Sequence, residues 1–212
     1  MLDRNPQWRR AWISLAAQEL NSPAAARSWL DDVEKHLPAD ALQERITLAD
    51  AWATAGQRLD IPGSLDESAR LLRDLVANYP ESAEVALAEA ILMERTEQPE
   101  KAVAAYRRTL ELDPDQPIAL NNLAMRLAEQ SAHLGEAEEL ARRAIKLEPD
   151  RAAFYDTLAH VLALKGEHEK AIEHMNEAVR LQPNQLAWQV NLAKVLLEGG
   201  ESRQARAVYE QF

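Results

Sequence analysis

Histidines and carboxylates are the residue types in this chain that could bind a metal ion. His160, His168 and His174 lie close together in the sequence, with glutamates around them. A zinc-binding helix needs two histidines four residues apart and a glutamate between them, so that both rings face one ion. Ile172 stands where the second histidine would follow His168, and His174 falls on another helix face. The sequence therefore predicts no metal site, and we interpret these histidines as solvated or groove-lining side chains.

Nucleophiles and phosphate-binding loops are also missing from the sequence. No serine stands in a Gly-x-Ser-x-Gly turn, the six glycines form no phosphate-binding loop, and cysteine is absent. Glutamates and arginines over residues 136–143 are spaced as i,i+4 pairs on an exposed helix face, not as an acid and a base in a cleft. The sequence therefore predicts that the protein is not an enzyme and carries no cofactor.

The overall composition limits the classes of partner. The 212 residues include 24 Lys and Arg against 35 Asp and Glu, which gives a net charge of −11 at pH 7. This acidic balance argues against nucleic acid, because that binding depends on neutralising phosphates. No run of about 18 apolar residues is present, so we expect no membrane insertion. Hydrophobic residues make up 47% of the chain, which is enough for a folded core.

Prolines reveal an internal repeat. Pro80, Pro114, Pro149 and Pro183 follow one another at steps of 34, 35 and 34 residues. The alanines that keep nearly the same steps are Ala102, Ala137, Ala171 and Ala205. A period of this length is typical of arrays of short structural units, none of which can bury its apolar face alone.

The clearest unit spans residues 152–185. Apolar residues recur at helical spacing over 158–164, and Lys165-Gly166-Glu167 interrupts them. A second helical pattern follows and is stopped by Pro183. The sequence predicts a helix, a short turn, a second helix and a proline stop in each unit. Small residues such as Ala171 are expected where helix backbones approach closely.

This unit resembles a tetratricopeptide repeat (TPR). The family signature places aromatic, small and large apolar residues and a final proline at set positions over 34 residues. These positions are filled in order by Tyr155, Leu158, Ala159, Leu162, Ala171, Met175, Ala178 and Pro183. The resemblance implies an all-α fold, a right-handed α-solenoid of stacked helix-turn-helix units.

With looser matches included, the resemblance covers nearly the whole chain as one array of about six units. Their predicted bounds are 7–38, 42–80, 83–116, 117–151, 152–185 and 186–212. The second unit contains an insertion at 57–63, which ends in Asp60-Ile61-Pro62-Gly63 and favours a turn there. The last unit is truncated in its second helix, and the segment from Leu2 to Pro6 resembles the close of a preceding unit. We therefore expect a fragment of a longer bacterial TPR protein.

The resemblance also implies a binding groove, since the first helix of each TPR unit lines the concave surface. Helical spacing maps these residues to it: Leu87, Ile91, Asn121, Asn122, Met125, Asp156, Thr157, His160, Val190, Asn191 and Lys194. Asn122 and Asn191 occupy places where some family members hydrogen-bond a peptide backbone. Asparagine is also a common helix-surface residue, and both interpretations stay open.

One TPR ligand class is disfavoured by the same mapping. Chaperone-binding TPR domains use Lys, Arg and Asn side chains from three units to bind a terminal carboxylate. The corresponding positions here hold Leu87, Ile91, Asn122, Ala153 and Thr157. Only the asparagine matches, and a shift by one unit brings in no cation. We therefore expect no clamp of this kind in these units.

The sequence predicts a non-catalytic protein–protein interaction scaffold that binds a peptide or a partner protein in its concave groove. Two alternatives stay open. One is a regulatory or substrate-positioning arm of a larger enzyme, and the other is a self-assembling envelope or export scaffold that associates through uncapped ends. The first residues lack the apolar segment of a signal peptide. We expect a soluble protein, with bacterial cytoplasm and periplasm both open.

Overall fold

The computed structural model describes residues 6–131 and 133–210, which form twelve α-helices and no β-strand. The helices are α1 Pro6–Glu19, α2 Pro23–His36, α3 Leu42–Leu59, α4 Ser64–Asn78, α5 Ala83–Arg95, α6 Pro99–Leu112, α7 Pro117–Glu129, α8 Leu134–Leu147, α9 Ala152–Leu164, α10 His168–Leu181, α11 Leu186–Glu198 and α12 Ser202–Tyr209. The predicted all-α class is confirmed. The predicted closing segment of a preceding unit lies, up to Asn5, outside the described residues. Within the described ranges, no helix is both long and apolar enough to cross a membrane.

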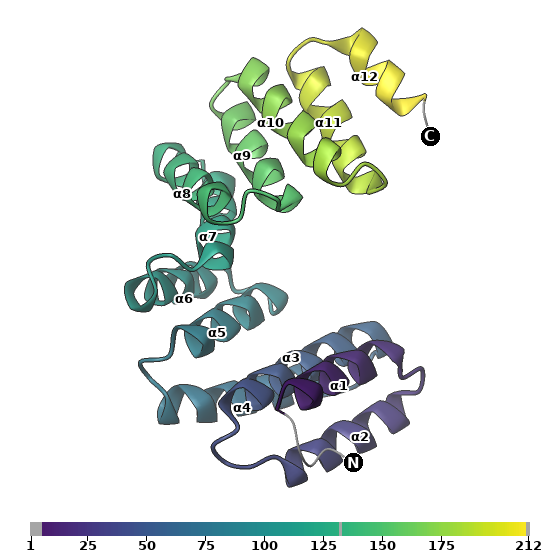
Figure 1. Cartoon of the computed structure of the whole chain (residues 1–212), viewed down its shortest axis with the longest axis vertical. Coiled ribbons are helices and arrows are strands. Elements are labelled where there is room, and N and C mark those ends of the chain that lie inside the picture. The colour runs from purple at the N-terminus through teal and green to yellow at the C-terminus, as the bar shows by residue number, and fades with distance from the viewer. Residues whose placement is uncertain (1–5, 132, 211–212) are drawn as a thin grey trace. The chain divides into compact units, whose positions relative to one another are not determined.

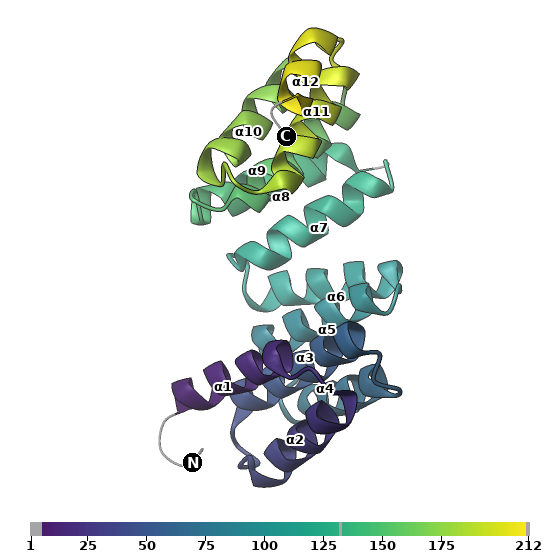
Figure 2. The same ribbon diagram turned by 90° about the vertical axis from the view of Figure 1, so that its right-hand side faces the viewer.

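The chain divides into two compact units. Unit 1 ends at Leu112 and contains α1–α6, and unit 2 begins at Asp113 and contains α7–α12. In unit 2 the helices pair as the hairpins α7–α8, α9–α10 and α11–α12, and each hairpin packs on the next (Figures 1 and 2). The fold is an all-α solenoid of helix-turn-helix units, as the repeat predicts.

The turns within the hairpins, from α3–α4 to α11–α12, share one backbone feature. Each contains a residue in the left-handed region, with φ between 53° and 83°. The residues are Asp60, Glu97, Ser131, Gly166 and Gly200. In the α9–α10 turn, the N–H of Glu167 donates to the Leu162 carbonyl at 2.9 Å, which satisfies an end of α9. From Glu97 on, these residues recur at steps of 34, 35 and 34, so the sequence period reappears in the backbone.

Small side chains lie at the helix contacts of unit 2. Ala159 of α9, together with Ala171 and Ala178 of α10, is fully buried between these paired helices and their neighbours. Alanine keeps the backbones close, and large residues such as Met175 fill the space beside them. The prediction that Ala171 lies at a close helix contact agrees with this burial.

Unit 1 departs from the regular repeat in α3 and α4. Helix α3 continues to Leu59, so the predicted insertion at 57–63 is helical in its first three residues and only 60–63 form the turn. A Cβ added to Gly56 would lie 1.8 Å from Oγ of Ser64. The end of α3 therefore touches the start of α4, and only glycine fits at this contact.

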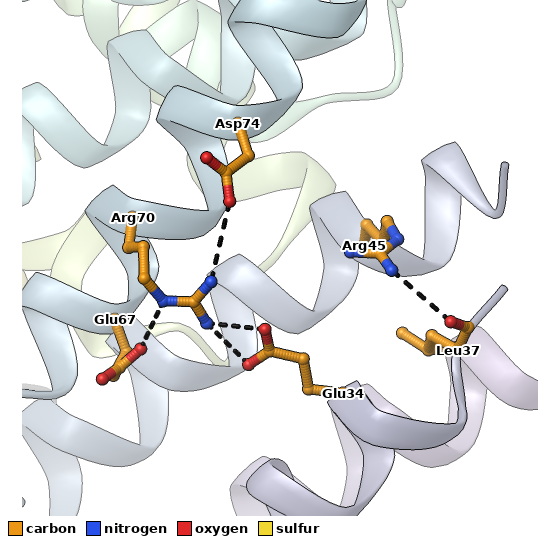
Figure 3. A network of polar contacts seen from close by, with 6 residues as sticks. All are labelled: Glu34, Leu37, Arg45, Glu67, Arg70 and Asp74. Carbon is orange, nitrogen blue, oxygen red and sulfur yellow. Dashed lines mark hydrogen bonds and ion pairs between the residues drawn. The ribbon is translucent and has the colours of Figure 1, made fainter. Parts of the chain in front are cut away.

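Charged side chains connect helices in unit 1. Arg70 of α4 lies 2.6 Å from Glu34 of α2, and it also pairs with Glu67 at 2.8 Å and with Asp74 at 3.6 Å (Figure 3). The hydrogen bonds to Glu67 and Glu34 raise the pKa of Arg70 above its usual value. This network links two helices that belong to successive hairpins.

Helix α1 packs mainly on α3, and less on its own hairpin partner α2. Arg9 of α1 donates two hydrogen bonds to Oε1 of Glu44 in α3, at 2.9 and 3.1 Å. Arg58 at the other end of α3 donates to the Ala17 carbonyl at 3.2 Å. The first helices of unit 1 are thus joined by arginines at both ends.

Candidate partner-binding surface

The first helices of the hairpins lie side by side within each unit. In unit 1, α1 contacts α3 and α3 contacts α5, and in unit 2, α7 contacts α9 and α9 contacts α11 (Figures 1 and 2). Each row of helices has a depression in its surface. We call these the unit 1 hollow and the unit 2 hollow, and define each by its lining residues below.

The unit 1 hollow has a volume of about 380 Å³ and lies over α3 and α5. Its apolar lining consists of Ile46, Ala49, Ala53, Leu72, Leu87, Ala88, Ile91 and Leu92. Its polar lining consists of Ser14, Gln43, Thr47, Asp50, Ser68, Glu84 and Arg95. An apolar floor with a few polar groups at the edge is the usual composition of a binding pocket.

The charged groups of the unit 1 hollow are largely paired with each other. Arg95 of α5 lies 2.9 Å from Asp50 of α3 and donates to Oγ1 of Thr54 at 2.9 Å. This pair connects the two helices at the edge of the hollow. The sequence-predicted residues Leu87 and Ile91 both line the apolar part.

The unit 2 hollow is smaller and more polar, with a volume of about 230 Å³. Its lining residues are Met125, Glu129, Asp156, His160, Met175, Asn191, Lys194, Val195 and Glu198. Five of them were predicted from the sequence, and they come from α7, α9 and α11. The structure therefore brings Met125, Asp156, His160, Asn191 and Lys194 together around one depression.

Asp156 is the carboxylate of the unit 2 hollow whose pKa is shifted by burial. Nδ2 of Asn191 donates to its Oδ1 at 2.8 Å, across from α11 to α9. Burial raises the pKa of Asp156 above its usual range, and the hydrogen bond from Asn191 partly opposes that shift. Among the described residues, Asp156 forms no ion pair. Asn191, for which the sequence leaves both a peptide-binding role and an ordinary surface role open, thus already binds a carboxylate of the chain itself.

Two predicted groove residues belong to the packed interior instead. Thr157 is 2% exposed and Asn121 is 8% exposed. The hydroxyl of Thr157 donates to the Ala153 carbonyl at 3.2 Å, within its own helix. Helical spacing placed both residues on the surface, but the neighbouring first helix covers that part of the face. We correct the mapping for Thr157 and Asn121 accordingly.

The remaining predicted residues lie elsewhere on unit 2. Asn122 accepts a hydrogen bond from Nδ2 of Asn121 at 3.1 Å. Val190 is 58% exposed and lines a third depression of about 340 Å³ between α11 and α12, next to Leu186 and Tyr209. The predicted set therefore divides among both hollows, the interior and a separate apolar surface.

Sequence reasoning missed several residues that line the hollows. Glu129 and Glu198 stand four residues after Met125 and Lys194, so one more helical turn along the same faces would have found them. Ile46 and Asp50 of α3 carried no such signal. The insertion after α3 disturbs the repeat, and the register of that helix could not be transferred from its neighbours.

The other histidines lie outside the two hollows. His174 of α10 is half-buried, with its ring centroid 6.2 Å from that of Tyr155, and burial lowers its pKa. His168 begins α10 and packs beneath Gly199. In the part of the chain that the structure describes, no three His, Asp or Glu side chains form a group that could hold a metal ion.

Comparison with known proteins gives the family. Two family models, both described as tetratricopeptide repeat, match residues 63–117 and 87–136 in one case and 152–185 in the other. A TPR repeat-containing protein of Pseudomonas aeruginosa is 25% identical over 172 residues, which are 81% of this chain and 28% of that protein. The chain thus spans less than a third of the length of this relative.

Solved structures with a similar fold include two of different kinds. MamA from Desulfovibrio magneticus superposes with a TM-score of 0.65 at 19% identity, over 79% of this chain and 92% of that chain. An O-GlcNAc transferase from Thermobaculum terrenum superposes with a TM-score of 0.52 at 28% identity, over 54% of this chain and 22% of that chain. The first of these likenesses concerns the fold alone.

Proposed function

Since the chain belongs to the tetratricopeptide repeat family, whose arrays are interaction scaffolds, we propose that it is a non-catalytic scaffold that binds a peptide or a partner protein on its first-helix faces. The observation that carries the proposal is the unit 1 hollow. It combines about 380 Å³ of space with an apolar floor on two adjacent helices. Such a depression accepts apolar side chains of a bound segment.

The binding energy in this proposal comes mainly from apolar anchors. Leu87 and Ile91 are one helical turn apart on α5, so both can contact the same inserted side chain. Burying one large aliphatic side chain contributes about 1.5–3 kcal/mol. The Asp50–Arg95 pair lies partly in solvent and contributes little energy by comparison. Its role in the proposal is to orient the segment.

The paired state of Arg95 supports the expectation that no terminal carboxylate is clamped. A clamp needs cations that are free to meet the ligand, and Arg95 already binds Asp50 and Thr54. The segment in this proposal is therefore recognised along its length rather than at its end.

Peptide selection provides the test. A phage library of random twelve-residue peptides is selected on the immobilised chain, and the affinity of the enriched peptides is measured by fluorescence anisotropy. The double change Leu87→Ala with Ile91→Ala should weaken binding by about 2 kcal/mol or more, roughly 30-fold, while the helical content remains unchanged.

The matched control removes two leucines of equal size elsewhere. Leu147 and Leu164 are 40% and 43% exposed and line neither hollow, so Leu147→Ala with Leu164→Ala should leave affinity unchanged. Equal binding by the unit 1 variant, or a loss confined to the control, would contradict the proposal.

A second candidate function is an arm of a larger enzyme that positions its substrate. The likeness to an O-GlcNAc transferase favours it, because the matched part is 22% of that enzyme. The two candidates differ in what the intact polypeptide contains. Mass spectrometry of the endogenous protein that carries this sequence would reveal a catalytic region under the second candidate and none under the first.

A further inference from the structure

The unit 2 hollow has a chemistry that the unit 1 hollow lacks. We propose that it receives one basic side chain, a lysine or an arginine, from the segment that the chain binds; this inference rests on the proposed function and names the chemistry of the partner. The hollow lies among α7, α9 and α11 and carries Glu129, Asp156 and Glu198, one carboxylate on each helix.

Two of the three carboxylates already have a cation nearby. Glu129 lies 2.8 Å from Arg126 on its own helix, and Glu198 lies 4.0 Å from Lys194. Asp156 accepts a hydrogen bond from the amide of Asn191 and forms no ion pair among the described residues, although Lys194 and His160 attract its charge from farther away. A half-buried carboxylate without a cation in contact is costly, and a cation beside it lowers that cost. Three carboxylates and one lysine line the hollow, so its lining has an excess of negative charge that a basic side chain would offset.

The size and apolar lining of the hollow agree with a single long side chain. Its volume of about 230 Å³ is below the roughly 300–1,000 Å³ typical of small-molecule pockets. Met125, Met175 and Val195 provide apolar contacts for the methylene stem of a lysine or arginine. Asp50 of the unit 1 hollow is already bound by Arg95, so the same basic side chain has no equivalent site there.

Charge-neutral analogues test this inference. In the peptides selected on the intact chain, each arginine is replaced in turn by citrulline, which keeps hydrogen-bond donors but carries no charge. In each peptide, replacing the one arginine that occupies the hollow should weaken binding about tenfold, and replacing any other arginine should have little effect. Asp156→Asn should weaken the parent peptide by a similar factor and should affect the citrulline peptide little. Asparagine keeps the shape and the acceptor for Asn191, and a melting curve checks the fold.

The matched control is Glu173→Gln, which removes one charge from an exposed position on α10. It should change neither affinity nor the preference for arginine over citrulline. Selected peptides without lysine or arginine, or a tenfold preference that persists in Asp156→Asn, would overturn the inference while the scaffold function stands. A library that yields no binding peptide would overturn the proposed function, and this inference with it.

Discussion

Units 1 and 2 are both built from successive helical hairpins, but they differ in the contacts between their helices and in the residues that line their hollows. Both units place fully buried alanines at their helix contacts, such as Ala55 and Ala171, and unit 2 has a polar hollow. Unit 1 also joins its helices with arginines, such as Arg9 and Arg70, and has an apolar hollow. The repeat therefore determines where the first-helix surface lies, while the residues between the repeat positions determine what that surface binds.

The difference follows from how closely each unit keeps the repeat. Where alanine recurs at the contact positions, backbones approach and dispersion contacts suffice to hold the hairpin. Around the long helix α3, alanines such as Ala51 and Ala55 are buried too, but the spacing of the repeat is disturbed by the insertion. There Arg70, Arg9 and Arg58 also reach across to carboxylates and carbonyls on other helices. Polar connections of this kind depend on charge and salt, so the two units should respond differently to the same perturbation.

The largest expected effect is on the alanine packing of unit 2. Ala171→Leu places a larger side chain at a fully buried position and should cost about 1–3 kcal/mol of unfolding free energy. Urea denaturation followed by circular dichroism measures it. Ala104→Leu on the exposed side of α6 is the matched control and should cost nothing measurable. An unchanged midpoint for Ala171→Leu would mean that this contact is not tightly packed.

A smaller effect is expected from the arginine network of unit 1. Arg70→Met keeps the aliphatic stem but removes the ion pairs with Glu34, Glu67 and Asp74, and should cost about 1 kcal/mol at low salt. Screening should reduce that cost at 1 M NaCl. The packing cost of Ala171→Leu should persist at the same salt concentration. Equal salt dependence of both variants would remove the distinction between the units.

The hairpin turns offer a comparison at matched backbone positions. Glu97 and Gly166 both adopt positive φ, at 55° and 77°. Glu97→Gly should therefore stabilise unit 1 by about 0.5–1 kcal/mol, and Gly166→Ala should destabilise unit 2 by a similar amount. An added Cβ at Gly166 meets no atom within 4 Å, so the expected loss comes from the backbone alone. Thermal melting measures whether each variant is more or less stable than the parent. A higher melting temperature for both variants would contradict the expected effect of positive φ.

The smallest effects concern pH and have opposite signs at two carboxylates. Burial raises the pKa of Asp156, so its charged form opposes folding and Asp156→Asn should gain a few tenths of a kcal/mol at pH 7. That gain should shrink as the pH falls through the raised pKa and vanish below pH 3.8, where both states are protonated. A loss at pH 7 would indicate that the hydrogen bond from Asn191 and the attraction of Lys194 and His160 outweigh the cost of burying the charge.

Glu138 provides the opposite case. The hydrogen bond from Lys165 lowers the pKa of Glu138, so its charged form favours folding above the ordinary value of 4.5. Glu138→Gln should therefore lose about 0.5 kcal/mol at pH 7, and the loss should diminish as the pH falls below 4.5 through the lowered pKa. Unfolding free energies of Asp156→Asn and Glu138→Gln, measured at several pH values, should show the gain for the first and the loss for the second.

The fold was predictable from the sequence because the repeat is expressed in residues that interact locally. The prolines, the alanines and the turn at Gly166 each act within one hairpin, so their spacing translates directly into helix bounds. The binding surface was less predictable. Helical spacing assigns Thr157 to a face of its helix, but it does not reveal how far the packing of other helices buries that position.

The hollow of unit 1 was only half predicted, for a related reason. Leu87 and Ile91 follow from the repeat in α5, and Arg95 lies one helical turn beyond Ile91. Ile46 instead belongs to α3, whose register the disturbed repeat does not give. The sequence also did not predict which carboxylate of the unit 2 hollow lacks an ion pair. The hydrogen bond between Asn191 and Asp156 joins residues on two different helices. Such pairs depend on side-chain directions that sequence spacing does not determine.

The contact pattern of the helices has a consequence for synthesis of the protein. Among the described residues, each helix makes its main contacts with helices next to it or next but one along the chain. A hairpin of about 34 residues takes roughly 2–7 s to emerge from a ribosome at 5–20 residues per second, whereas helices form within about a microsecond. The two helices of a hairpin such as α7–α8 therefore have time to form and meet before α9 has been translated, although they are fully stabilised only when the next hairpin packs on them. The newly made chain then exposes one unpaired hairpin face at a time, and chaperones have a correspondingly small surface to protect.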